Sequence, residues 1–249
     1  MFSPNITGLQ KFYFSPLGQL VQRKIAKIIE QNCGEIRNAN IVGIGFATPY
    51  LLPLLHETNG VFACMPAAQG VMRWPTASKN LALLTDESLL PFADNSVQAV
   101  IVVHCLENSE QGRKMLDEIH RVLAPMGKLI LIVPNRHGIW THSDNTPFSY
   151  GRPFTLWQLR HLLLEHELTP IGSDFALFFP PWSHRYILKL APLLEKIGSS
   201  FFRNFGGVCA VIAEKQIYAT IKSPLKSYAK PSYIGLARPV MSKNFKKKL

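Results

Sequence analysis

The chain has 249 residues, 47% of them hydrophobic, which is enough for one α/β domain with a sizeable core. Its formal net charge of +11 is concentrated at one end, since nine of the 27 lysines and arginines follow Glu214 and no acid does. The body is therefore nearly neutral, and we expect no specific nucleic-acid partner. No apolar run reaches membrane-spanning length and no leader pattern is evident, so we expect a cytoplasmic protein without membrane insertion.

The four cysteines are isolated from one another and lie in or beside apolar runs: Cys33, Cys64, Cys105 and Cys209. Their spacing is not that of zinc ligands or of a disulfide framework. We therefore expect reduced thiols in the core and no metal site.

Residues 12–33 predict an amphipathic helix with apolar side chains at helical spacing. Ser15 is a suitable cap and Pro16 suits the first turn. The stretch that follows, Asn40–Leu55, begins with a short apolar run and a small-residue turn at Gly43, Gly45 and Ala47, and a helix-like segment starts at Pro49. A strand, a tight turn and a helix start allow backbone amides to approach a nucleotide-like ligand closely.

Further short apolar runs alternate with helical patterns, notably the helix predicted over Gln111–Leu123. The predicted strands are Val61–Cys64, Ala82–Leu84, Ala99–Val103 and Lys128–Val133. Strands that are apolar on both faces and alternate with helices indicate a parallel sheet covered on both sides. Because the carboxyl ends of such strands line one edge, the Gly43 turn, Met65, Asp86 and His104 are expected to converge there.

The segment from Pro134 to Pro153 is a long loop dense in aromatic and polar residues, which is typical of a functional loop. Later elements are predicted as helix Leu156–Glu167, a strand near Ile171–Phe179, helix Ser183–Ile197 and strand Gly207–Ala213. The chain is thus divided into an N-terminal helical segment (1–36), a main domain (37–216) and a basic tail (217–249).

Two stretches, Thr85–Asn108 and Leu116–Asn135, carry a longer pattern. It reads D-x-x-x-L-P-F at Asp86, L-E before Asn108, and L-x-E-x-x-R-V-L-x-P-x-G from Leu116. The pattern resembles that of class I S-adenosylmethionine (SAM)-dependent methyltransferases of type 11, over about Asn40–Val133. The resemblance implies a Rossmann-like α/β fold with a mostly parallel seven-stranded sheet, and SAM as the cofactor.

The resemblance also implies roles for single residues. Asp86 would accept a hydrogen bond from the adenine amino group. The cofactor-binding set is Gly43, Gly45, Ala47, Met65, Pro66, Asp86 and Glu87. Three family carboxylates are absent, because Gly43, Met65 and Gln98 stand at their positions. Loss of the ribose acid at Met65 predicts weak SAM binding.

The long loop looks like that of a bacterial subgroup of these methyltransferase-like proteins, with P-N-R-x-G-x-W and T-P-F-x-x-G-R-P-F. Its substrate-binding candidates are Arg136, Trp140, Phe148 and Arg152, two cations for a carboxylate or phosphate and two aromatic rings for an apolar wall. In the alternative interpretation, the arginines satisfy loop carbonyls. His104 is the candidate proton acceptor, and its alternative is a buried, satisfied histidine.

The functional hypothesis is a SAM-dependent methyltransferase that acts on a small-molecule acceptor. The alternative is a degenerate, non-catalytic protein of the same fold that binds a ligand or a protein. The predicted N-terminal helix either packs on the sheet or, as in many methyltransferases that this chain resembles, closes Tyr13–Gly18 over the ligand site.

Overall fold

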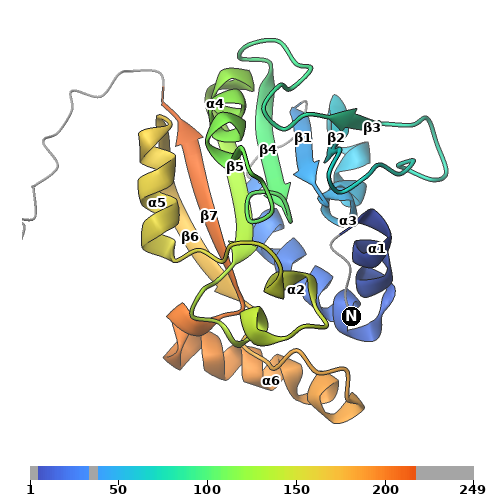
Figure 1. Ribbon diagram of the computed structural model, residues 1–249, viewed down its shortest axis with the longest axis vertical. Helices are drawn as coiled ribbons and strands as arrows, with labels where there is room; N and C mark the ends of the chain where they lie inside the picture. The colour runs from blue at the N-terminus through green and yellow to red at the C-terminus, as the bar shows by residue number, and fades with distance from the viewer. Residues whose placement is uncertain (1–4, 34–38, 217–249) are drawn as a thin grey trace, which may run out of the picture. The chain divides into compact units, whose positions relative to one another are not determined.

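The computed structural model describes residues 5–33 and 39–216. Its centre is a seven-stranded sheet in the order β3-β2-β1-β4-β5-β7-β6, with β7 antiparallel to both of its neighbours and the other pairs parallel (Figure 1). The strands are β1 (Asn40–Gly45), β2 (Gly60–Pro66), β3 (Ala82–Thr85), β4 (Val97–Val103), β5 (Leu123–Pro134), β6 (Leu168–Ala176) and β7 (Val208–Lys215). The predicted mostly parallel sheet is confirmed, whereas the predicted basic tail lies outside the described residues.

The helices divide between the two faces of the sheet. On β1, Ile41 packs with one core cluster and its neighbour Val42 with the other, because side chains alternate along a strand. The helices α1 (Ile6–Phe14), α2 (Pro16–Cys33), α3 (Thr48–Leu51) and α6 (Arg185–Phe201) contribute buried residues to the first cluster, and α4 (Gly112–Val122) and α5 (Leu156–Glu165) to the second. Short 3₁₀ helices are η1 (Leu52–His56), η2 (Ile139–His142), η3 (Pro147–Ser149) and η4 (Arg203–Phe205).

The N-terminal segment contains two helices: the predicted helix, with its cap at Ser15 and Pro16 in its first turn, is α2, whereas α1 before it was not predicted. Asn5 caps α1 by accepting from the Gly8 amide at 2.9 Å. The chain breaks at Ser15, whose hydroxyl accepts from the Gly18 amide at 3.0 Å and thereby caps α2 as expected. Pro16 has no amide hydrogen and restricts the backbone of Ser15, so a continuous helix cannot form there.

The four cysteines are buried, as predicted. Burial raises the pKa of the Cys33 thiol to about 11 and that of Cys64 to about 12, so both stay protonated at neutral pH. Within the described ranges, no helix is long and apolar enough to cross a membrane, and no three His, Cys, Asp or Glu side chains gather as metal ligands would.

Candidate functional site

The strands β1, β2, β3 and β4 end side by side at one edge of the sheet. In the pairing register, Gly45 lies opposite Val103 and Pro66 opposite Thr85. Asp86 and His104 directly follow these ends. Four positions far apart in sequence are thus brought to the edge where ligands bind in parallel α/β sheets.

The turn after β1 is built by two glycines with different roles. Gly45 has φ +79°, and a Cβ there would lie 2.4 Å from the Val103 carbonyl oxygen, so only glycine fits. Gly43 holds the position of the family's first acid, and a Cβ there would lie 2.6 Å from both Ala47 Cβ and Leu51 Cδ1. Because α3 packs directly against the strand, there is no space for a side chain at position 43.

A cavity of about 490 Å³ lies beside this turn and is called the turn cavity below. Its lining includes Gln10, Tyr13, Phe46, Thr48, Met72 and Trp74. The volume is in the range of small-molecule sites. No Asp or Glu is among the lining residues, so the cavity has the volume for a small molecule but offers no carboxylate to it.

The remaining predicted cofactor residues lie at the same edge, in different surroundings. Met65 is fully buried, and its Sδ is 3.4 Å from the Met72 amide nitrogen. Asp86 is exposed and accepts from the Ser88 amide and hydroxyl at 2.8 and 2.7 Å, which hold the pKa of its carboxyl below the usual range. Glu87 accepts from the Ser109 hydroxyl at 2.9 Å. Both acids therefore order the loops around the edge.

Two charged residues of α4, Glu118 and Arg121, clamp the loop after Asp86. Glu118 Oε2 accepts from the Leu90 amide at 2.9 Å. Arg121 donates to the carbonyls of Leu90 and Phe92 at 3.0 and 2.9 Å and pairs with Glu118 and Asp94. The E-x-x-R spacing places both side chains one turn apart on one helix face, which explains why this motif accompanies the loop.

A chain of hydrogen-bonded, buried polar side chains, called the buried relay, lies at the carboxyl end of β4. The Tyr50 hydroxyl donates to the Tyr13 hydroxyl at 3.0 Å, and the Tyr13 hydroxyl oxygen is 2.8 Å from His104 Nε2. His104 Nδ1 is 3.3 Å from Glu107 Oε1. The sequence indicated His104, the L-E motif and, in one alternative, the Tyr13–Gly18 segment, but no local pattern links these residues to one another or to Tyr50.

The relay fixes the tautomer of His104. Burial raises the pKa of both tyrosine hydroxyls above the ordinary value, so they remain protonated. Tyr13 accepts from Tyr50, and its own proton therefore points to Nε2. In this state Nε2 is the acceptor, and Nδ1 carries its hydrogen toward Glu107.

Glu107 is the acidic group that the buried relay brings to this edge. Its side chain has no exposed surface, and neither carboxylate oxygen accepts a hydrogen bond from the described residues. The neighbouring Gln69 donates its amide to the His104 carbonyl, while its own side-chain oxygen has no donor among those residues. A buried carboxylate whose nearest donor is the His104 Nδ1–H, 3.3 Å away, is costly unless a positive group is near it. The site therefore suits a ligand that brings positive charge.

The long loop closes over the relay through its backbone. Gly151, with φ +78°, passes so close to Glu107 that a Cβ would lie 2.3 Å from its carbonyl oxygen. The Arg152 amide donates to that carbonyl at 2.7 Å. The Phe148 ring lies 4.8 Å from the His104 ring, centroid to centroid. The G-R pair and Phe148 thus hold the end of β4 in place.

The other loop candidates lie elsewhere. Arg136 donates to the Pro153 carbonyl at 3.0 Å, as the alternative interpretation expected. Trp140 is fully buried in the core and donates to the Phe179 carbonyl at 2.7 Å. The Arg152 side chain is exposed and, with Arg136 and Arg113, lines a shallow groove of about 270 Å³.

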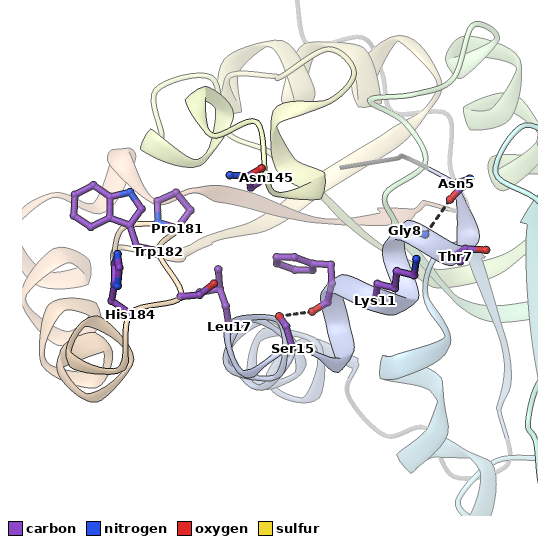
Figure 2. A pocket seen from close by; sticks show the side chains of 12 residues that line it. Asn5, Thr7, Gly8, Lys11, Ser15, Leu17, Asn145, Pro181, Trp182 and His184 are labelled. Atoms are coloured by element: carbon purple, nitrogen blue, oxygen red, sulfur yellow. Dashed lines mark hydrogen bonds between the residues drawn. The ribbon is translucent and has the colours of Figure 1, made fainter. Parts of the chain in front are cut away.

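A second cavity, of about 620 Å³, opens between α1, the long loop and the segment before α6, and is called the loop cavity (Figure 2). Lys11 on α1, Asn145 in the loop, and Trp182 and His184 line it. Adjacent α1 residues divide the two cavities, since Phe12 lines the loop cavity and Tyr13 the turn cavity. No sequence pattern predicts the loop cavity, because its walls come from three separated segments.

Comparisons with known proteins agree with this geometry. Residues 42–131 match the family model described as a methyltransferase domain. No protein in the curated set matches the chain.

Several solved structures share the fold. A SAM-dependent methyltransferase from Thermotoga maritima is 14% identical, with a TM-score of 0.58, and the match covers 85% of this chain and 96% of that one. One from Archaeoglobus fulgidus is 17% identical, with a TM-score of 0.57 and coverage of 83% and 97%. Geranyl diphosphate C-methyltransferase from Streptomyces coelicolor, solved with S-adenosyl-L-homocysteine, is 16% identical, with a TM-score of 0.52 and coverage of 77% and 78%. Residues 42–131 thus match a methyltransferase domain, and the chain shares the fold of these SAM-dependent methyltransferases.

Proposed function

We propose that this protein binds SAM at the carboxyl edge of its sheet and transfers the methyl group to a small-molecule acceptor. The observation that carries the proposal is the His104–Glu107 pair, buried at the end of β4, with a carboxylate that accepts no hydrogen bond from the described residues. The family match covers the strands that build this edge. A bound sulfonium would supply the positive charge that Glu107 lacks, together with an electrophilic methyl group.

The turn cavity and the loop beside it are the proposed cofactor contacts. In the turn cavity, Phe46 and Trp74 offer apolar surface and Thr48 a hydroxyl. Asp86, which is not among the residues that line this cavity, is the acid that the family uses for the adenine amino group. The glycine at position 43 and the buried Met65 leave the ribose without a carboxylate. We expect weaker binding than in relatives that keep these acids.

The buried relay would manage the acceptor's proton. His104 Nε2 is the basic atom, and Glu107 stabilises the imidazolium that would form when it takes a proton. In the structure, the Tyr13 hydroxyl is hydrogen-bonded to His104 Nε2, so this atom is not accessible to an acceptor. An acceptor hydroxyl or amine must therefore displace Tyr13, which requires α1 to shift. The loop cavity, with Lys11 at its wall, is the proposed entrance for an acceptor that carries negative charge.

Calorimetric titration with SAM and with S-adenosylhomocysteine tests the cofactor assignment. We expect saturable binding of both. Gly45→Val should abolish it, because the side chain would strike the Val103 carbonyl and deform the turn. Gly172→Val on β6 is the matched control, since the nearest atom to a Cβ there is 3.6 Å away and the position is far from the turn.

Two observations favour the non-catalytic alternative. The rings of Tyr13 and Phe46 stack with centroids 5.3 Å apart beside the turn, and no carboxylate lines the turn cavity. If neither SAM nor its demethylated product binds, this packed arrangement is the functional state, and the proposal of methyl transfer fails.

A further inference from the structure

Helix α6 exposes a continuous stripe of large apolar side chains, called the α6 stripe below. Its members recur every three or four residues, which places them along one line of the helix surface. They are Trp182, just before the helix, and Tyr186, Leu190, Leu193, Ile197 and Phe201. Tyr186 is 74% exposed and Phe201 is 80% exposed. The helix does bury another face, through Ala191 and Gly198.

The α6 stripe is too long to be incidental surface. Single exposed apolar residues are normal on a monomer, but a contiguous run marks an interaction site. The run is extended beyond the helix by Phe202 and Phe205, which are 58% and 59% exposed. In Figure 1, α6 runs along the lower margin of the drawn domain. A partner surface of considerable length is needed to cover it.

The charges beside the α6 stripe are all of one sign. Arg185, Lys189 and Lys196 are exposed and, at spacings of four and seven, form a row along one flank of the stripe. The single acid in residues 182–205, Glu195, points back into the domain and accepts from the amides of Leu177 and Phe178 at 3.0 and 2.9 Å. The exposed ionised side chains of this segment are therefore basic.

We infer that α6 is an interfacial helix that binds the surface of an anionic lipid membrane. An apolar stripe flanked by lysine and arginine matches the boundary between acyl chains and phosphate headgroups. Aromatic side chains at both ends of the stripe suit the same boundary, where rings lie with one side in hydrocarbon and one in water. A helix in this position lies in the plane of the surface and does not cross it.

Vesicle co-sedimentation of the full chain tests the inference. The protein should bind vesicles of phosphatidylcholine mixed with phosphatidylglycerol, and should bind phosphatidylcholine alone weakly. The double variant Leu193→Glu, Ile197→Glu should lose at least about tenfold in affinity. Leu164→Glu on α5 is the matched control, since Leu164 is 50% exposed, close to Leu193 at 55%, and lies outside the α6 stripe.

The basic residues after Glu214 would also attract anionic vesicles, so the design separates the two sources. If the double variant binds as tightly as the parent while remaining folded by circular dichroism, those residues carry the binding and the inference fails. Lys189→Gln with Lys196→Gln should weaken binding by about fivefold per charge at low salt.

Tryptophan quenching by lipids brominated on their acyl chains reports insertion directly. Trp182 should be quenched, and Trp182→Phe should remove that signal. Trp157, 72% exposed on α5, should remain unquenched in both proteins. Binding without quenching of Trp182 overturns the inference. So does a concentration-dependent dimer that the double variant abolishes in the absence of lipid, because a second copy would then cover the α6 stripe.

Discussion

The sharpest test of the proposed site is Glu107→Gln, which removes one buried charge and keeps the side-chain shape. The carboxylate is fully buried, has His104 Nδ1 at 3.3 Å, and accepts no hydrogen bond from the described residues. SAM carries a sulfonium charge, whereas S-adenosylhomocysteine does not. The carboxylate should therefore favour the charged ligand, and its loss should weaken SAM binding while leaving the neutral product almost unaffected.

The size of the effect follows from the surroundings of Glu107. With an effective dielectric near 20, opposite unit charges roughly 6–8 Å apart attract by about 2 kcal/mol. That energy corresponds to about thirtyfold in dissociation constant. We expect the ratio of SAM to product affinity to fall by about this factor, measured by calorimetric titration of both ligands. Glu165→Gln is the control, because Glu165 lies on α5, pairs with Arg113 and is outside the predicted cofactor-binding set. An unchanged ratio in Glu107→Gln would refute the assignment of Glu107 as the partner of the sulfonium.

Three further predictions concern the structure around the site. Tyr13→Phe removes the hydroxyl that links Tyr50 to His104, and the lost buried hydrogen bonds should lower the free energy of unfolding by about 1–3 kcal/mol, measured in urea. Hydrogen bonds from Arg121 lower the pKa of the Glu118 carboxyl. The stability that they add is therefore present above about pH 4.5 and is lost as the pH falls through the lowered pKa. In Glu118→Gln, the drop in melting temperature on acidification should be smaller than in the parent. Met65→Glu places a charge at a fully buried position and should lower the melting temperature by many degrees, whereas a stable variant with tighter SAM binding would show that the side chain reaches the ribose.

The sequence alone determined the architecture and the edge at which the site lies. Apolar runs alternating with helical patterns predict the parallel strands, and the structure has them at β1, β2, β4 and β5. The Ser15 cap and the break at Pro16 also follow from local chemistry, since a proline lacks the amide that a helix requires. These features depend on residues that are neighbours in the chain, and periodicity therefore reveals them.

Other features depend on contacts between segments that are far apart in the chain, and local sequence patterns do not reveal such contacts. Trp140 was predicted to wall a pocket, but it meets Phe179 and is buried. Glu118 and Arg121 look like surface charges until the loop at Leu90 is found beneath them.

The relay itself is the clearest case. Tyr13 and His104 are 91 residues apart, and Tyr13 and Tyr50 are 37 apart. No spacing rule connects them, because the contact of α1 with His104 depends on tertiary packing, in which the Tyr13 ring stacks on Phe46 beside the turn at Gly45. The chain order placed His104 at the sheet edge, and tertiary packing alone decided which hydroxyl and which carboxylate would face its two nitrogens.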